Sequence, residues 1–432
     1  MKRCGAMSAL IVVIPLFDSS MTVKSYRLCG HNSEIALDIR GDFREKSQVY
    51  YMPGLELAQT LGLETFSGDM PIFVDVNRFH ILNGMFANKS IPPDKLILTI
   101  PANIEADAKL LIGIEHLKEL GYSIAIDGYP QHGLNSHLIG TTDHIMLSFR
   151  DKKFSQQFQE VKKNLKKVQL IISNLPTMED YNKYSSNEQA LFTGDFYNHP
   201  VTSGNAEISP IKANAIRLLK EMNQDDFELK NIAGIIERDP ALSISLLRFI
   251  NSPAVGLKSK VDSINSAVAI LGQREVHHWA TIAISVDMFQ DRPGEIIRIS
   301  LVRAKFAENL TLLFEMGAFQ HSLFMAGLFS LLDLILNKPM EEAIKEVAVD
   351  NLVREALVER TGVLYRVLDF MYAYERADWN KVSIIMIQND IKGELVGKAF
   401  VDALVWYNQL LGSIDSYSED GAEPLEKEGA AV

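Results

Sequence analysis

Two aspartates in the first half of the chain, Asp75 and Asp127, carry side chains that could hold a metal ion. Each lies at the end of an apolar run that predicts a buried strand, at 72–76 and 123–126. Carboxylate oxygens are preferred ligands of hard divalent cations, so the pair could hold one such ion weakly. Arg27, in another predicted strand, could instead pair with either carboxylate and replace the metal with a salt bridge. Ordinary polar residues at strand ends are the alternative.

The histidines of the second half do not form a convincing metal site. His277 and His278 are adjacent, so on a helix their side chains point about 100° apart and cannot easily share an ion. His321 and Asp333 are too far apart along a helix to chelate together. We expect structural or surface roles for these histidines, and the sequence predicts no cofactor and no metal.

Composition sets the broad class of the protein. The chain has 432 residues, of which 47% are hydrophobic and 23% charged, which fits a globular protein with two domains. The formal net charge of -12 argues against a nucleic-acid partner. The only two cysteines, Cys4 and Cys29, are too few for a disulfide framework, which favours a reducing cytoplasm.

The amino-terminal segment superficially resembles a signal peptide, with charged residues at 2–3 before an apolar run at 9–16. The run is broken by Pro15 and lacks a small-residue cleavage site, so a buried first strand is favoured. No stretch is expected to be long and apolar enough to span a bilayer. We therefore predict a cytoplasmic protein with no membrane partner. The acidic segment 413–432 predicts a disordered, solvated tail.

Short apolar runs alternate with helical patterns through the first half of the chain. Such alternation implies a parallel sheet with crossover helices, and about eight strands over roughly 200 residues predict a TIM-like α/β barrel. Active sites of these barrels lie at the carboxyl ends of the strands. The predicted strands cover residues 9–14, 24–28, 72–76, 96–100, 123–126, 144–147, 169–172 and 190–192.

The second half opens with clearly punctuated helices. Asp239 can cap a helix whose first turn suits Pro240, and apolar residues then recur at helical spacing. Asn251 and Ser252 precede a proline that ends this helix, and Gly272 stops the next one. The polar, glycine-containing stretch before these helices predicts a linker. The predicted organisation is a barrel at 1–200, a linker at 201–208, an all-α domain at 209–412 and a tail at 413–432.

These segments, taken in order, resemble two domains of bacterial signalling proteins. Residues 229–253 resemble the HDOD domain, a helical module. Four earlier segments resemble the EAL domain, a barrel family whose enzymes hydrolyse cyclic di-GMP; they are residues 14–28, 95–100, 120–129 and 191–200. The chain is thus identified as a member of the EAL–HDOD (YuxH-like) proteins. The resemblance implies an EAL-type α/β barrel followed by an all-α HDOD domain.

Active EAL enzymes use two metal ions, held by carboxylates at strand ends, to polarise a phosphodiester and generate hydroxide. The resemblance implies that this site is degenerate here. The signature glutamate falls on Arg27, and the paired aspartates fall on Asp127 and Gly128. The family's metal-binding asparagine and next glutamate, its catalytic lysine and its two later glutamates fall respectively on Asp75, Thr99, Met146, Ser173 and Pro176.

HDOD domains look like relatives of the HD phosphohydrolases that have lost their metal ligands. Those enzymes use a His-Asp pair on one helix, with further histidines and an aspartate. In this chain Ser330 and Leu331 fall where the pair would be, within an apolar stretch at 323–336 that predicts one buried central helix. The resemblance implies no hydrolysis by this half.

A non-catalytic signalling protein accounts for both losses, because each half keeps the pattern of its fold and lacks the residues of its chemistry. We expect a pseudo-EAL barrel and an HDOD docking module that act through contacts with signalling proteins in cyclic di-GMP-related regulation. Self-association stays open. So do two alternatives: a cyclic di-GMP phosphodiesterase with a divergent site, and a receptor that binds cyclic di-GMP without hydrolysis.

Three aromatic residues near the end of the helical half suggest a partner surface. Tyr372, Tyr374 and Trp379 could form an exposed aromatic anchor for another protein. The alternative is that the three rings pack between helices.

Overall fold

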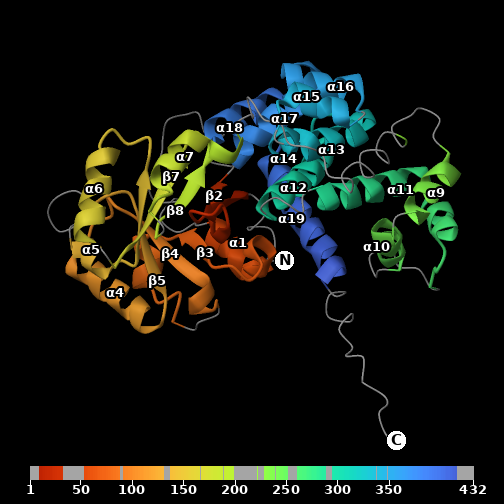
Figure 1. Ribbon diagram of the computed structural model, residues 1–432. Coiled ribbons are helices and arrows are strands. Elements are labelled where there is room, and N and C mark those ends of the chain that lie inside the picture. The colour runs from red at the N-terminus through yellow and green to blue at the C-terminus, as the bar shows by residue number, and fades with distance from the viewer. Residues whose placement is uncertain are drawn as a thin grey trace, which may run out of the picture.

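A β/α barrel and a helical domain packed against it make up the chain, so the predicted fold class is confirmed (Figure 1). The computed structural model describes residues 9–32, 53–87, 91–130, 137–165, 167–187, 189–198, 221, 228–238, 240–251, 260–288, 294–336, 338–347 and 349–415. The predicted linker at 201–208 lies outside these residues, as does most of the predicted tail.

Eight strands close the barrel in sequence order, as the alternation of apolar runs predicts. All eight predicted strands are present, several of them longer than their apolar run. They are β1 (Ala9–Phe17), β2 (Val23–Asn32), β3 (Ile72–Asp75), β4 (Leu96–Pro101), β5 (Ser123–Asp127), β6 (His144–Ser148), β7 (Gln169–Leu175) and β8 (Leu191–Gly194).

The first strand runs antiparallel to both of its neighbours, which corrects the expectation of a wholly parallel sheet. Only residues 18–22 connect β1 to β2, whereas a parallel connection needs a crossover of about a dozen residues or more. The carboxylate of Asp18 closes this hairpin by accepting hydrogen bonds from the backbone N–H groups of Ser20 and Thr22 at 2.8 and 3.0 Å. β1 meets β8 only at the pair Phe17–Phe192, so most of its outer edge is unpaired within the sheet.

The barrel interior is apolar below and polar at the carboxyl ends of the strands. A separate inner core consists of Leu16, Phe73, Ile97, Ala125, Met146, Ile171 and Leu191. Alternate residues of a strand face the same side, so the residue two positions after an inner apolar residue also faces inward. In β3, β4, β5 and β7 these residues are Asp75, Thr99, Asp127 and Ser173.

Short helices cover the outside of the barrel. Side-chain caps fix the start of two of them: Asp107 accepts from the N–H of Leu110 at 2.9 Å, and Thr177 accepts from that of Asp180 at 3.1 Å. The helices are α1 (Pro53–Leu61), α2 (Glu64–Ser67), α3 (Arg78–Leu82), α4 (Ala108–Glu119), α5 (Leu138–Thr141), α6 (Phe154–Asn164) and α7 (Met178–Tyr184), and a 3-10 turn, η4 (Asp195–Asn198), follows β8.

The helical domain has two parts. Helices α9 to α11 lie at the end remote from the barrel, whereas α12 to α19 form the part beside it (Figure 1). The elements are α9 (Leu229–Glu237), α10 (Pro240–Ile250), α11 (Ile264–Met288), α12 (Gly294–Leu310), α13 (Gln320–Leu328), α14 (Leu332–Leu336), α15 (Met340–Glu346), α16 (Asn351–Arg354), the π-helical turn η7 (Glu355–Glu359), α17 (Gly362–Glu375), α18 (Trp379–Gln388) and α19 (Gly393–Asp415).

The predicted helix punctuation is largely confirmed. Pro240 is the first residue of α10, and Gly272, at φ 74°, interrupts α11 before the helix resumes. Asn251 ends α10, where its side chain bonds to the backbone of Leu247 and of Val261. Asp239 and Ser252 lie outside the described residues.

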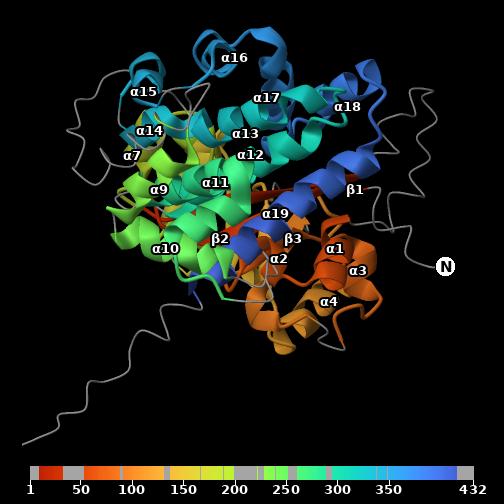
Figure 2. The same ribbon diagram turned by 90° about the vertical axis from the view of Figure 1, so that its right-hand side faces the viewer.

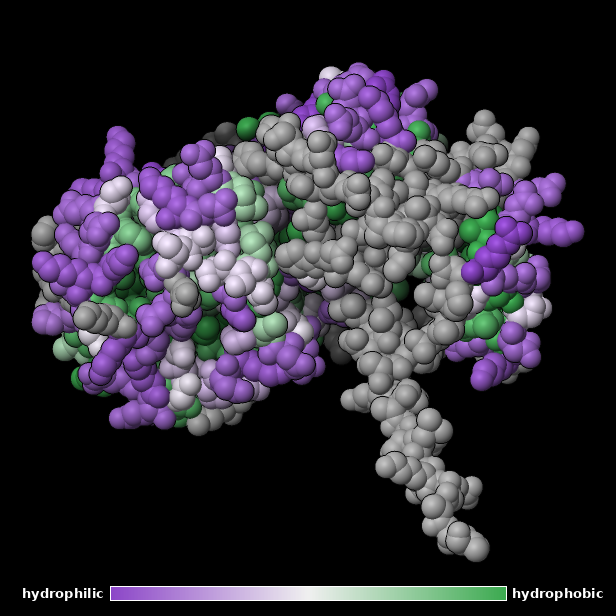
Figure 3. Space-filling view, in the orientation of Figure 1, coloured by the Kyte–Doolittle hydropathy of each residue, from purple (hydrophilic) through white to green (hydrophobic). Residues whose placement is uncertain are grey.

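One apolar stretch, Gly317–Leu336, is long and apolar enough by length and composition to cross a membrane, which overturns the expectation that no stretch reaches this limit. Its most apolar window is 67% buried inside the protein, as expected for a core segment. The predicted single helix at 323–336 is also wrong in detail, because a 3-10 turn, η6 (Phe329–Leu331), separates α13 from α14. In Figure 3 hydrophilic side chains cover most of the visible barrel face.

Helices α12, α17 and α19 of the helical domain pack on the barrel, with α19 lying along β1 (Figures 1 and 2). The N–H of Ile11, on the unpaired side of β1, donates to the hydroxyl of Tyr374 at 3.0 Å. The hydroxyl of Tyr26 donates to Glu295 at 2.6 Å, and Arg298 binds the same carboxylate at 2.8 Å. We call this contact, formed by these five residues, the domain seam. It joins the two domains through buried polar groups as well as apolar ones.

The aromatic residues near the carboxyl end of the helical domain contribute to packing. Tyr374 is fully buried in the domain seam. Trp379 stacks on His31 of the barrel with ring centroids 5.4 Å apart, and the half-buried Tyr372 lies over the guanidinium of Arg303 at 5.2 Å. The packing alternative is therefore the correct one for Tyr374 and Trp379.

Candidate functional site

An arginine lies between the two aspartates at the carboxyl ends of the barrel strands. Nη2 of Arg27 donates to Oδ1 of Asp75 at 2.9 Å and to Oδ2 of Asp127 at 2.6 Å. Nη1 of the same guanidinium lies 2.9 Å from the sulfur of Met146. We call this group of four residues the barrel mouth. The sequence suggested that Arg27 could pair with either carboxylate. The structure has this salt bridge, and Arg27 pairs with both.

The guanidinium of Arg27 is held firmly in its charged form. Its side chain is only 16% exposed, and this burial disfavours the charge. The neighbouring acidic groups, Asp75 first among them, outweigh that effect and hold the pKa of Arg27 well above its ordinary value. Because guanidinium groups carry several donors in a planar fork, one arginine can satisfy two carboxylates at once.

The other predicted barrel residues give few ligands for a metal. Thr99 is buried, and its hydroxyl has no hydrogen-bond partner among the described residues. The hydroxyl of Ser173 donates to the carbonyl of Leu147 at 3.3 Å. Gly128 has φ 99°, a conformation that favours glycine over an aspartate. Pro176 follows β7 and offers no side-chain donor or acceptor.

These residues do not fit the pair of metal ions that active EAL enzymes use. Two hard cations need several anionic oxygens, and the barrel mouth has two carboxylates, both bonded to Arg27. Within the described residues, no three histidine, cysteine, aspartate or glutamate side chains are close enough together to hold a metal ion.

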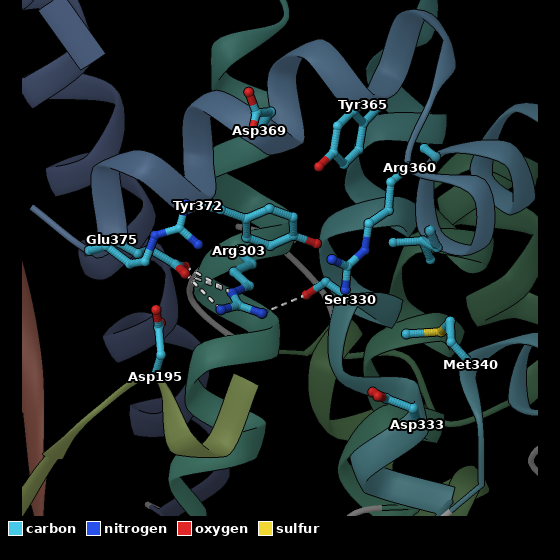
Figure 4. A pocket seen from close by; sticks show the side chains of 13 residues that line it. Asp195, Arg303, Ser330, Asp333, Met340, Arg360, Tyr365, Asp369, Tyr372 and Glu375 are labelled. Carbon is cyan, nitrogen blue, oxygen red and sulfur yellow. Dashed lines mark hydrogen bonds and ion pairs between the residues drawn. The ribbon is translucent and has the colours of Figure 1, made fainter. Parts of the chain in front are cut away.

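A second candidate site is a cavity of about 400 Å³ in the helical domain, beside the end of the barrel (Figure 4). It contains Ser330, one of the two residues at the expected HD position, whereas Leu331 is 2% exposed and belongs to the core. We call it the helical pocket, lined by Asp195, Arg303, Ser330, Asp333, Met340, Ala356, Leu357, Arg360, Tyr365, Asp369, Tyr372, Glu375 and Arg376.

A buried arginine also dominates one side of the helical pocket. Arg303, 2% exposed, donates to both carboxylate oxygens of Glu375, the shortest contact being 2.7 Å, and to the hydroxyl of Ser330 at 3.1 Å (Figure 4). Burial disfavours the charge of Arg303, but Glu375 outweighs this and raises the pKa of Arg303. Gly327 lets α13 approach this part of α12, since a Cβ there would lie 2.6 Å from the carbonyl oxygen of Arg303.

Of the residues that line the helical pocket, the sequence pointed to Ser330, Asp333 and Tyr372 but not to the ion pair that builds one side of it. Arg303 and Glu375 are 72 positions apart, and nothing local in the sequence links them. The available signal was Arg303 itself, a charged residue inside the apolar run of α12, because such residues are rarely buried without a partner. Asp333 lines the pocket and His321 does not; the side chains of His277 and His278 lie outside the described residues.

Comparison with known proteins finds one matching domain family and two homologues. The HDOD domain family matches residues 208–368. The YuxH protein of Bacillus subtilis is 27% identical over 340 residues, which are 76% of this chain and 82% of that protein. CdgJ of Vibrio cholerae, named a cyclic di-GMP phosphodiesterase, is 22% identical over 320 residues, 73% of this chain and 74% of that protein.

Two solved structures similar to the barrel half are both EAL domains. An EAL domain protein from Listeria monocytogenes has a TM-score of 0.32 and 13% identity, covering 44% of this chain and 87% of that one. The FimX EAL domain from Pseudomonas aeruginosa, solved bound to c-di-GMP, has a TM-score of 0.34 and 12% identity, covering 47% and 94%. The chain thus combines a closed β/α barrel with a match to the HDOD domain family, and it is similar over about three quarters of its length to YuxH and CdgJ.

Proposed function

We propose that this protein is a non-catalytic, cytoplasmic signalling protein in which a pseudo-EAL barrel and an HDOD docking module act through protein contacts. The observation that carries the proposal is the position of Arg27 between Asp75 and Asp127. In active EAL enzymes metal ions supply positive charge at this place, and here the covalently attached guanidinium of Arg27 supplies it.

A guanidinium cannot replace the chemistry of those ions. A metal ion hydrolyses a phosphodiester by binding a water molecule and lowering its pKa, so that hydroxide is available near neutral pH. Arg27 cannot coordinate a water molecule as a metal ion does. A guanidinium is also not deprotonated in proteins, so it cannot act as a general base. The barrel mouth balances most of its own charge internally, and it lacks the means to activate water.

Exposed apolar residues on α18 support a docking role for the helical domain. Ile384 and Ile387 are 55% and 46% exposed and lie three positions apart, so they share one face of the helix. Cross-linking of full-length protein in cells, compared with an Ile384→Asp, Ile387→Asp double variant, tests this surface. A partner captured by the wild type and lost in the variant is expected; equal capture by both contradicts docking at α18.

The non-catalytic assignment is tested by incubating purified full-length protein with cyclic di-GMP and Mg²⁺ or Mn²⁺. Vibrio cholerae CdgJ, treated identically, is the positive control. No product above the protein-free blank is expected. Metal-dependent turnover that Asp127→Asn abolishes would revive the phosphodiesterase alternative and remove the proposal.

Calorimetry with cyclic di-GMP in the same buffer separates a receptor from a scaffold. The scaffold proposal predicts no heat of binding and no rise in melting temperature at high nucleotide concentration. Saturable binding that Arg27→Met removes would instead assign a receptor function to the barrel mouth.

A further inference from the structure

Four polar side chains point into the helical pocket, two of them from α17, one from η6 and one from the residue after η7. Figure 4 shows the guanidinium of Arg360 directed toward Ser330, with the hydroxyls of Tyr365 and Tyr372 facing the same space. Arg360 exerts an electrostatic effect on Tyr372, as expected if the two groups are close. One guanidinium and three hydroxyls thus converge on one volume. Ser330 is already bonded to Arg303 and Tyr372, which leaves Arg360 and the two tyrosine hydroxyls as hydrogen-bond donors.

The backbone that carries Arg360 is unusual. Arg360 has φ 55° and ψ 42°, a left-handed conformation that is strained for a non-glycine residue. It directly follows the π-helical turn Glu355–Glu359, a feature common at functional sites. Gly362, at φ 83°, lets the chain pass the carboxylate of Glu355, which would lie 2.7 Å from an added Cβ. Strain of this kind persists where the surrounding structure enforces it, and it clusters at ligand sites.

The charges around the pocket leave Arg360 available. Glu375 is bonded to Arg303, and Asp369 is bonded to Lys381 at 2.6 Å. Among the described residues, neither Arg360 nor Arg376 has an ion pair with a carboxylate. Figure 4 places Asp195 across Arg303 from Arg360. Asp333, the fourth acidic residue of the lining, lies below Arg360 in Figure 4; it is 5% exposed and already has an interaction within the protein. Arg360 therefore supplies uncompensated positive charge to its side of the pocket, which suits an anionic group.

We propose that the helical pocket binds a phosphate-bearing small molecule of about mononucleotide size, with Arg360 contacting the phosphate. A planar guanidinium fork and two hydroxyl donors match the multiple oxygens of a phosphate. Met340, Ala356 and Leu357 give the pocket an apolar side for the rest of the ligand. A volume of about 400 Å³ falls in the range of small-molecule sites. The site is separate from the barrel mouth, so it stands or falls independently of the proposed function.

Calorimetric titration of full-length protein with inorganic phosphate and with adenosine monophosphate tests the site. Both probes are expected to bind, and the nucleotide more tightly, because only it reaches the apolar side. Equal affinity for the two probes would contradict the assigned ligand size. No saturable binding of either at millimolar concentration would overturn the proposal.

Arg360→Gly is the decisive variant, because glycine adopts a positive φ without strain. The variant is expected to fold with an unchanged or raised melting temperature. Its affinity for both probes should fall by about tenfold or more. Arg366→Ala is the matched control: Arg366 is an exposed arginine of α17 that bonds to Asn389 and does not line the pocket. Binding unaffected by Arg360→Gly, or reduced equally by Arg366→Ala, would contradict the assignment.

Discussion

The hydroxyl of Tyr374 accepts a hydrogen bond from the backbone N–H of Ile11 at 3.0 Å, and so joins the helical domain to the first barrel strand. This N–H lies on the edge of β1 that β8 leaves unpaired. The next residue, Glu375, holds Arg303 in the helical pocket, just as Tyr26 of the seam directly precedes Arg27 of the barrel mouth. Each candidate site is therefore one residue from a seam contact.

Removing the hydroxyl of Tyr374 is expected to weaken the domain seam. In Tyr374→Phe the N–H of Ile11 stays buried without a partner, which costs about 1–3 kcal/mol. Hydrogen exchange of the β1 amides should therefore speed up, as measured by mass spectrometry. Tyr365→Phe is the control, because its hydroxyl faces the helical pocket (Figure 4). Unchanged exchange of β1 in Tyr374→Phe would mean that the seam does not depend on this bond.

The barrel was predictable because its strands are read from local pattern. Each strand has its own apolar run, and inward-facing residues follow from the two-residue period of a strand. The antiparallel direction of β1 was also available, in the short connection at 18–22. The contact between β1 and Tyr374 could not be predicted from the sequence, because Ile11 and Tyr374 are 363 positions apart and such a contact leaves no local pattern.

Asn251 is expected to stabilise the remote end of the helical domain. Its side chain donates to the carbonyls of Leu247 and Val261 at 2.6 and 2.7 Å and accepts from the N–H of Val261 at 2.8 Å. Asn251→Ala removes all three bonds and should reduce local stability by about 2 kcal/mol, seen as faster hydrogen exchange in α10 and α11.

Asn265 supplies the control for this experiment. It donates one exposed hydrogen bond to Glu237 at 2.7 Å, so Asn265→Ala should change local stability by less than about 0.5 kcal/mol. Similar exchange rates in Asn251→Ala and Asn265→Ala would show that Asn251 does not tie α10 to the following segment.

The lowered pKa of the partly buried His144 predicts that the protein loses stability in mild acid. Burial, reinforced by Lys118, lowers the pKa of His144, although Asp143 and a hydrogen bond with Gln169 oppose the shift. Below about pH 6.5 the unfolded chain therefore takes up a proton that the folded chain does not, and stability falls with pH. The slope is at most about 1.4 kcal/mol per pH unit for one histidine.

Thermal melts between pH 7.5 and pH 5.5 measure this effect. The profile of His144→Asn should be flatter than that of the wild type, whereas His116→Asn should leave it unchanged, because the side chain of His116 is 61% exposed. Parallel profiles for the wild type and His144→Asn would contradict the role of His144.

The two candidate sites were predictable to different degrees. Arg27, Asp75 and Asp127 follow strand by strand from the sequence, so their meeting at one barrel end was expected. The helical pocket depends on the left-handed backbone of Arg360 and on the ion pair between Arg303 and Glu375. Both features result from tertiary packing, so the helical periodicity of the sequence does not predict either of them.

Binding of Mn²⁺ to purified protein decides whether the barrel mouth is a guanidinium site or a metal site. Wild-type protein is expected to bind no Mn²⁺ there at concentrations up to about 1 mM, the range of weak carboxylate sites. Arg27→Met should gain weak binding, because it releases both carboxylates, and the Arg27→Met, Asp127→Asn double variant should lose it. Mn²⁺ binding by the wild type that Asp127→Asn abolishes would contradict the replacement of metal by Arg27.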